Sequence, residues 1–310
     1  MSKKELHSES HLVESREYWW NPDYLSLLAE RLDINECKNM ADIGCGQGMM
    51  SLLFAEHLPK GANVTGIDSE SRYIKRAIQK ARKVAKRTEV NLAFEQGNAE
   101  AINLKDQSQD IVFCQTLLIH VPSPEKVLAE MKRCTKPGGY VVAMEPNNLA
   151  ANLVFDKYLQ TDYKVEDMLD FMEIRLRCEK GKRALGEGFN SIGDSLPDLF
   201  KQAGLDDIEV FISDKALSLI PPYDTREKRV RAAQMIDWIE NQSAGFGYDY
   251  NWRYYKAGGG NKKTFDAHWE NVSHYQQQLL RELKNQECLL SGGNLMYIVK
   301  GRNGERAGDY

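Results

Sequence analysis

Residues 39–145 alternate short apolar runs with longer stretches that have helical spacing. Five runs have the length and composition of strands: NMADIG, ANVTGID, VNLAFEQG, DIVFCQ and YVVAMEP. Segments of helical character, such as the charged stretch 71–86, lie between most of them. Strands that alternate with helices form parallel sheets, because the connection between two parallel strands must cross the face of the sheet. The alternation therefore predicts a doubly wound α/β fold.

The alternation stops near residue 149, and two further strand-like runs, DIEVFIS and NLMYIVKGR, follow at wide intervals. Long helical stretches separate these runs from the earlier ones, and we interpret them as insertions into one sheet. Before the sheet, Asn21 and Pro22 open a helix as its N-cap and first residue. The predicted fold is a seven-stranded Rossmann-like sheet with an N-terminal helical cap and two helical insertions over the carboxyl ends of the strands. Its expected parts are the cap (1–36), the core (37–149), a helical insertion (150–190), a core continuation (191–220), an aromatic-rich helical insertion (221–291) and a last strand with its tail (292–310).

The composition excludes several classes of protein. The 310 residues carry a formal net charge of −4, which gives no general attraction to nucleic acid or to an anionic membrane. The first ten residues lead into no apolar segment, and the longest apolar runs, such as YVVAM, are far shorter than a membrane span. The six cysteines form no CxxC pair and no cluster with histidine, which is typical of reduced thiols. We therefore expect a cytoplasmic protein that binds no metal, no nucleic acid and no membrane.

A glycine-rich turn, GCGQG at 44–48, follows the first predicted strand. It lacks the lysine of a triphosphate-binding loop, and Met49 stands where a dinucleotide fingerprint has its third glycine. The spacing is instead GxGxG, with Asp42 two residues before the first glycine. Asp68 closes the second strand about twenty residues beyond the turn, where a carboxylate can accept hydrogen bonds from both ribose hydroxyls. These neighbours favour a nucleoside cofactor other than a dinucleotide.

Two further motifs, GNAE after the third strand and CQTLLIHVPSP at the end of the fourth, complete an ordered set. Together the motifs resemble those of class I S-adenosylmethionine-dependent methyltransferases, and within them the small-molecule group related to ubiquinone and menaquinone biosynthesis. The resemblance covers roughly residues 37–148 and returns weakly in the sixth and seventh strands. It implies that S-adenosylmethionine is the methyl donor and that a small molecule accepts the methyl group.

The resemblance also implies roles for individual residues at the cofactor. The glycines of the turn let the backbone approach the methionine part and the ribose, Asp42 orients the methionine end, and Asp68 binds the ribose. Asn98 meets the adenine amine, and Gln115 meets the methionine amine. The cofactor-binding residues implied in this way are Asp42, Gly44, Cys45, Gly46, Gly48, Asp68, Ser69, Asn98, Ala99 and Gln115.

Two of these positions depart from the family pattern. Asn98 replaces a common aspartate, although its carbonyl oxygen can still accept a hydrogen bond, and it could alternatively only shape a turn. Ser69 stands where the family usually has an apolar residue against adenine, and Tyr73 is the candidate to supply that apolar face instead.

His120 and Glu145 are the candidate catalytic residues, because both follow strands that end at the expected crevice. A neutral imidazole near the transferred methyl group could remove a proton from the acceptor. The alternatives are a histidine that closes the loop after the fourth strand, and a solvated carboxylate at the end of the fifth. Methyl transfer from a sulfonium mainly requires alignment of the acceptor and exclusion of water, so no strong catalytic motif is expected.

Aromatic residues are dense in the second insertion, where 246–255 (FGYDYNWRYY) places six in ten positions and Trp238 and Trp269 lie near in sequence. The N-terminal run EYWWNPDY adds four more. Such density predicts a pocket for a small, partly apolar or aromatic acceptor. Alternatively, the aromatics join helices to the sheet or form a contact in a homodimer.

Other functions remain open from the sequence. They are an S-adenosylmethionine-binding sensor or partner subunit without transferase activity, a methyltransferase that acts on protein, and a nicotinamide oxidoreductase. The GxGxG spacing and Asp42 oppose the last of these.

Overall fold

The computed structural model describes residues 14–155, 164–243, 245–293 and 295–304. The chain forms two compact units. The sheet unit consists of Trp20–Asn147, Ser191–Asp214 and Leu295–Tyr310, and the helical unit of Met1–Trp19, Asn148–Asn190 and Lys215–Asn294. The two predicted insertions thus belong to one unit, whereas the predicted N-terminal cap is divided between the two at residue 20.

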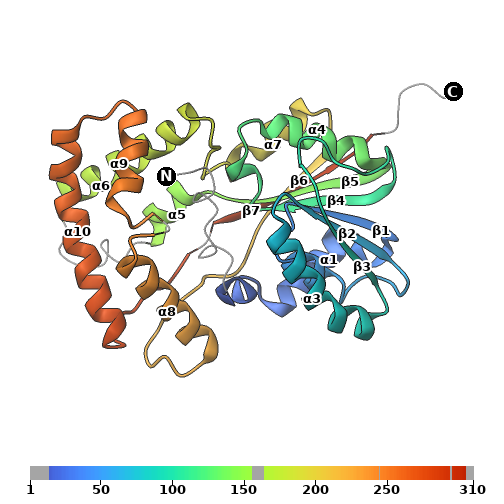
Figure 1. The fold of residues 1–310 in the computed structure, drawn as a ribbon, viewed down its shortest axis with the longest axis horizontal. Coiled ribbons are helices and arrows are strands. Elements are labelled where there is room, and N and C mark those ends of the chain that lie inside the picture. Colours follow the sequence, from blue (N-terminus) through green and yellow to red (C-terminus); the bar gives the residue numbers. More distant parts are fainter. Residues whose placement is uncertain (1–13, 156–163, 244, 294, 305–310) are drawn as a thin grey trace. The chain divides into compact units, whose positions relative to one another are not determined.

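The sheet unit contains seven strands in the order β3-β2-β1-β4-β5-β7-β6 (Figure 1). The first five strands pair in parallel, and β7 is antiparallel to both of its neighbours. This arrangement confirms the predicted seven-stranded α/β fold. The strands are β1 (Asn39–Ile43), β2 (Asn63–Asp68), β3 (Asn91–Gln96), β4 (Gln109–Gln115), β5 (Thr135–Pro146), β6 (Asp206–Ile212) and β7 (Met296–Arg302).

The central strands form the core of this unit, since each is nearly continuous in buried apolar side chains. Residues 111–114 of β4 and 141–144 of β5 are at most 1% exposed. A parallel sheet that is covered on both faces requires such runs rather than strict alternation. The helices of the unit are α1 (Pro22–Arg31), α2 (Met49–Phe54), α3 (Ser71–Thr88), α4 (Pro124–Cys134) and α7 (Leu196–Gln202).

The sequence of α3 and the start of α1 show how these helices are specified. The buried residues of α3, Tyr73, Ile74, Ala77 and Ala81, recur at intervals that place them on one face. Helix α1 starts at Pro22, as predicted, with Asn21 at the N-cap position. The Asn21 side chain makes no capping bond, however, and its amide nitrogen donates to Asp214.

The helical unit contains α5 (Asn148–Phe155), α6 (Val165–Ala184), α8 (Arg226–Glu240), α9 (Tyr248–Ala257) and α10 (Lys262–Lys284), with the short 3-10 helix η3 (Glu14–Tyr18). Helices α6 and α9 approach very closely. A Cβ atom at Gly181 would lie 1.8 Å from the Tyr254 carbonyl oxygen, and one at Gly258 would lie 2.1 Å from the Arg177 carbonyl oxygen. The two glycines therefore permit this backbone contact, which no larger residue could share.

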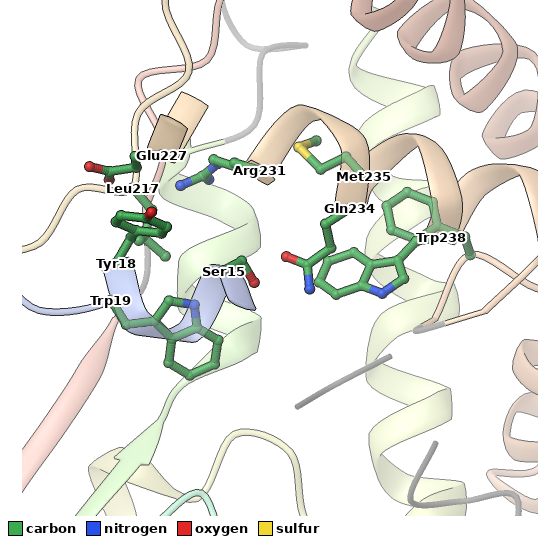
Figure 2. Close-up of a pocket in the computed structure, with 10 residues that line it drawn as sticks. Ser15, Tyr18, Trp19, Leu217, Glu227, Arg231, Gln234, Met235 and Trp238 are labelled. Atoms are coloured by element: carbon green, nitrogen blue, oxygen red, sulfur yellow. The ribbon is translucent and has the colours of Figure 1, made fainter. Parts of the chain in front are cut away.

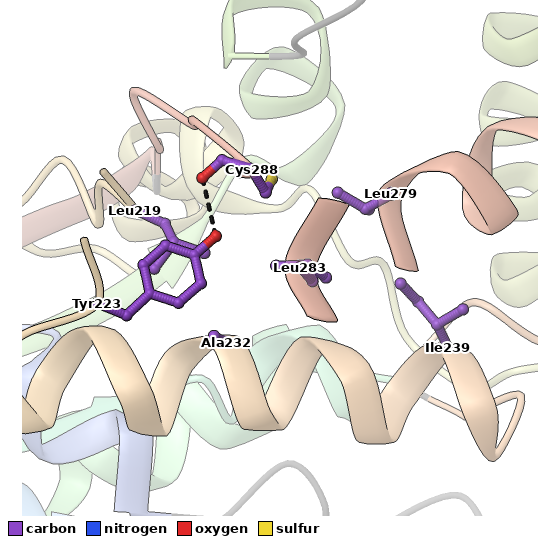
Figure 3. Packing of buried hydrophobic residues seen from close by; sticks show 7 residues of the cluster. All are labelled: Leu219, Tyr223, Ala232, Ile239, Leu279, Leu283 and Cys288. Atoms are coloured by element: carbon purple, nitrogen blue, oxygen red, sulfur yellow. Dashed lines mark hydrogen bonds between the residues drawn. The ribbon is translucent and has the colours of Figure 1, made fainter. Parts of the chain in front are cut away.

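Two apolar clusters fill the helical unit. In the first, Tyr255, Phe265 and Trp269 pack with ring centroids 5.0 and 5.4 Å apart along the series. In the second, the Tyr223 hydroxyl donates to the Cys288 carbonyl oxygen at 2.9 Å, beside Leu219 and Ala232 (Figure 3). Much of the predicted aromatic density therefore joins helices to one another. In the described part of the chain, no helix combines the length and apolar character that a membrane span requires.

Candidate functional site

The carboxyl ends of β1, β2 and β4 meet at one edge of the sheet. Ile43 at the end of β1 pairs in parallel with Ile67 of β2 on one side and with Cys114 of β4 on the other. The chain leaves β1 and runs toward β2, and later strands are added on the far side of β1. Such a reversal of strand order opens a crevice, which is where ligands bind in doubly wound sheets.

The glycine turn at this edge has a backbone that only glycine adopts without strain. Gly44, Gly46 and Gly48 have φ angles of +70°, +54° and +77°. The turn is also tightly enclosed, since a Cβ atom at Gly44 would lie 2.8 Å from Leu117, and one at Gly48 would lie 2.8 Å from Phe94. The three glycines thus form a compact, backbone-lined floor at the end of β1.

Asp68 is held directly beside this floor. Its Oδ2 atom accepts a hydrogen bond from the Gly46 N–H at 2.8 Å, and its Oδ1 atom accepts one from the Glu70 N–H at 2.9 Å. The carboxylate is half-buried, and each oxygen can accept further hydrogen bonds. The geometry is suitable for binding paired hydroxyl groups.

Gln115, the last residue of β4, presents a buried donor. Its Nε2 atom is inaccessible to solvent and has no hydrogen-bond partner among the described residues. A buried donor without a partner costs about 1–3 kcal/mol, which a bound acceptor group would recover. The methionine end of S-adenosylmethionine carries a carboxylate for the amide nitrogen and an ammonium for the amide oxygen. Gln115, Asp68 and the glycine floor therefore fit this cofactor.

Asp42 precedes the turn and Cys45 belongs to it, and both side chains are buried. Asp42 is only 2% exposed and accepts a hydrogen bond from the Ser51 hydroxyl at 2.6 Å. Burial raises the pKa of Asp42 to about 7 and raises the pKa of the Cys45 thiol well above its usual range. The hydrogen bond to Ser51 of α2 supports the turn, and direct contact of Asp42 or Cys45 with a ligand stays a prediction.

The residues expected at adenine lie after β2 and β3. Asn98 is exposed, and its side-chain oxygen accepts a hydrogen bond from the Glu100 N–H at 3.0 Å, so it shapes a turn. Ala99 is half-buried beside it, and Ser69 is exposed. Tyr73 is 3% exposed and carries the Arg72 guanidinium over its ring, which leaves little of that ring accessible. The adenine contacts stay predictions.

Glu145 has a supporting position that the sequence did not reveal. It is fully buried, so the alternative of a solvated carboxylate is wrong. Its Oε1 atom accepts hydrogen bonds from the Leu117 and Leu118 N–H groups at 2.8 and 2.7 Å. These bonds fix the 3-10 helix η5 (Leu118–His120), which ends at the half-buried His120. A catalytic role for either residue stays a prediction.

Thr116 is a second feature of this loop that sequence reasoning missed. Its φ angle of +49° is unusual for a β-branched residue, and its N–H donates to the Met144 carbonyl oxygen at 2.9 Å. Strained backbone of this kind collects at functional sites. No sequence signal marks it, because threonine gives no indication of a left-handed conformation.

Known proteins are similar to this chain in sequence and in fold. The methyltransferase domain family matches residues 34–204. The ubiquinone biosynthesis O-methyltransferase of Coxiella burnetii is 31% identical over 152 residues, which are 45% of this chain and 60% of that protein. An uncharacterised methyltransferase of Schizosaccharomyces pombe is 29% identical over 157 residues, which are 50% of this chain and 55% of that protein. The matched regions thus span less than two thirds of these relatives.

Solved structures support the fold alone. A protein of Bacillus halodurans has a TM-score of 0.51 at 14% identity, covering 91% of this chain and all of that one. The YcgJ protein of Bacillus subtilis has a TM-score of 0.50 at 17% identity, covering 92% of this chain and all of that one. The family match confirms S-adenosylmethionine as the predicted methyl donor. The chain therefore belongs to the methyltransferase domain family, in agreement with its resemblance to class I S-adenosylmethionine-dependent methyltransferases.

Proposed function

We propose that the chain transfers a methyl group from S-adenosylmethionine to a small, partly apolar or aromatic acceptor. The observation that carries the proposal is that the fixed Asp68 carboxylate and the buried Gln115 amide both lie at the glycine floor. The Nε2 atom of Gln115 has no hydrogen-bond partner among the described residues. When bound, S-adenosylmethionine supplies a methyl group already activated on sulfur. The chain itself has to bind the donor and the acceptor, align the acceptor with the methyl group, and exclude water.

The residues of the crevice divide these tasks. Asp68 accepts hydrogen bonds from the ribose hydroxyls, and Gln115 binds the methionine end. Glu145 positions the loop 117–120 through the two backbone hydrogen bonds. His120, at the end of this loop, is the proposed base that takes the proton of the acceptor. The residues proposed to contact adenine are Ser69, Asn98 and Ala99.

The composition of the helical unit supports the class of acceptor. Its aromatic side chains are not all used in helix packing, because Trp19, Trp238 and Phe246 line a cavity within that unit. Aromatic and apolar linings with a few polar groups are typical of small-molecule sites. We propose that the helical unit recognises the acceptor and that neither nucleic acid nor a membrane is a partner.

Location and assembly are further parts of the proposal. All six cysteines are free thiols, which supports a cytoplasmic location. Strand β6 lies at the edge of the sheet with Val210 and Ile212 about half exposed, at 45% and 48%. Exposed apolar side chains on an edge strand support a homodimer, which light scattering of the purified chain would test.

The experiment is a turnover assay that measures S-adenosylhomocysteine formation with a library of small phenols, amines and carboxylates. We expect product only when a small acceptor is present, and turnover that falls in His120→Ala while cofactor affinity holds. Tight S-adenosylhomocysteine binding without turnover on any small molecule or protein would favour the sensor. Turnover on protein alone would contradict the small acceptor.

A further inference from the structure

The helical unit contains a cavity of about 200 Å³ between η3 and α8 (Figure 2). It is smaller than the roughly 300–1,000 Å³ of sites for drug-sized ligands, so its occupant is the size of one ring or a short chain. Every residue that lines it belongs to the helical unit. None of its lining residues belongs to the glycine turn or to the strand ends of the cofactor crevice.

Flat apolar side chains form much of the wall. Trp238 and Phe246 stack with their ring centroids 6.3 Å apart and their planes at 29°. Trp19 contributes a further indole, and in the view of Figure 2 Ser15 lies between Trp19 and Trp238. Rings arranged around a narrow space favour a flat apolar body over a bulky or strongly hydrated one.

Arg231 brings a positive charge to this apolar space. It has no hydrogen bond or ion pair with any residue in the described ranges. Glu227, one turn earlier on α8, attracts it through space but pairs with Lys215 at 3.0 Å. Burial lowers the pKa of Arg231 to about 10, so the guanidinium remains charged at neutral pH. A partly desolvated cation that no described residue pairs directly favours an anion.

Ser15 adds a second unsatisfied group from a distant part of the sequence. It is 7% exposed, and its hydroxyl has no hydrogen-bond partner among the residues that the structure describes. Burial of a hydroxyl without a partner is unfavourable. Within the described chain, Ser15 on η3 and Arg231 on α8 are thus left unpaired in this cavity. The rest of its lining is mostly apolar and aromatic, apart from Glu227, which pairs with Lys215, and Gln234.

We propose that this cavity binds a small monocarboxylate with a flat apolar body. The planar guanidinium of Arg231 matches the two oxygens of a carboxylate, the Ser15 hydroxyl donates to one of them, and the ring lies against Trp19 and Trp238. Binding of a carboxylate in this cavity requires no step of the proposed methyl transfer. Binding at the cavity can be tested with no cofactor present. Its failure would remove the support that the cavity gives to the class of acceptor, and it would leave the proposed use of S-adenosylmethionine standing.

The test compares benzoate with benzamide, which has the same shape and no charge, by calorimetry on the full chain. We expect benzoate to bind at least about tenfold more tightly than benzamide. Arg231→Met should abolish this preference, Arg231→Lys should keep part of it, and Ser15→Ala should reduce it several-fold. Lys256→Met is the matched control, because it removes a positive charge from an exposed position on α9 and should change nothing.

Folding of each variant is checked by circular dichroism and by its affinity for S-adenosylhomocysteine. Arg231→Lys and Ser15→Ala keep the test informative if Arg231→Met does not fold. Equal affinity of the parent chain for benzoate and benzamide would overturn the proposal. So would failure of both probes to bind, or an unchanged preference in folded Arg231→Met.

Discussion

Within the described residues, the sheet unit and the helical unit both leave buried polar groups unpaired, but in different settings. In the sheet unit, the amide of Gln115 lies at a strand end beside a glycine floor. In the helical unit, Ser15 and Arg231 lie in a cavity between helical segments. The first setting follows from the topology of any doubly wound sheet, whereas the second depends on side chains particular to this chain. The comparison separates what the family shares from what distinguishes this member.

The largest expected effect concerns a buried carboxyl group of the sheet unit. Because burial raises the pKa of Asp42 to about 7, ionisation destabilises the native state. The contribution of neutral Asp42 to the free energy of unfolding is therefore fully present below the unfolded pKa near 4, and it is lost as the pH rises through the folded pKa of about 7. Relative to Asp42→Asn, the parent chain should lose up to about 4 kcal/mol of unfolding free energy between pH 4 and pH 8. Denaturant titrations across this range measure the difference.

Asp110 provides a control of opposite sign in the same sheet. Burial favours its neutral form, but hydrogen bonds from Lys136 and from two backbone N–H groups outweigh burial and lower the pKa of Asp110. Its contribution is present above the unfolded pKa and is lost as the pH falls. The destabilisation caused by Asp110→Asn should therefore disappear at acidic pH. A parallel pH dependence for both variants would contradict the assignment.

The helical unit should respond most strongly at its close backbone contact. Gly181→Val places side-chain atoms where the Tyr254 carbonyl oxygen lies only 1.8 Å from the position that a Cβ atom would take, so α6 and α9 must separate. We expect a loss of about 3 kcal/mol or more in unfolding free energy. Gly186→Ala is the control, because no atom lies within 4 Å of its Cβ position and only its φ of +68° opposes alanine. Backbone strain alone should cost that control about 1–2 kcal/mol, so a loss in Gly186→Ala as large as that in Gly181→Val would contradict a packing origin.

Substitution of Asp68 should weaken cofactor binding, whereas substitution at the contact between α6 and α9 should not. Asp68→Ala removes the carboxylate that Gly46 and Glu70 hold in place, so S-adenosylhomocysteine should bind about 1.5–3 kcal/mol more weakly. Asp68→Asn keeps one acceptor oxygen and should lose less. Calorimetry gives both values, and equal affinity in Asp68→Ala and the parent would remove Asp68 from the site.

The smallest effect is expected from a single hydrogen bond in the helical unit. Tyr223→Phe removes the hydroxyl that donates to Cys288 and leaves the ring in its cluster. The loss should be about 0.5–1.5 kcal/mol with no change in cofactor affinity. Thermal unfolding measures it, and a loss above about 3 kcal/mol would indicate that the hydroxyl supports more than this one contact.

The same comparison explains what could be predicted from the sequence. The glycine turn and Asp68 were predictable because both occur within single strand-turn-helix units whose spacing is visible along the chain. The support that Glu145 gives to residues 117 and 118 was not, because it depends on the register of β5 against β4. The sequence shows that a carboxylate is present at 145 but does not indicate which N–H groups it binds.

The helical unit was predictable only in its helical character. Aromatic density at 246–255 indicated both packing and a pocket, and the structure divides these residues. Tyr254 and Tyr255 are at most 1% exposed, whereas Phe246 lines the cavity. Ser15 and Arg231 line one cavity although they belong to segments that no periodicity in the sequence connects, so their proximity becomes visible only in three dimensions.

The central claim is that the crevice at the ends of β1, β2 and β4 binds S-adenosylmethionine. Isothermal titration of the full chain with S-adenosylhomocysteine and, separately, with a nicotinamide dinucleotide tests it most directly. The Asp68 carboxylate, the Gln115 amide and the GxGxG turn predict a measurable heat of binding for S-adenosylhomocysteine and none for the dinucleotide. Tight binding of the dinucleotide with no response to S-adenosylhomocysteine would contradict the account.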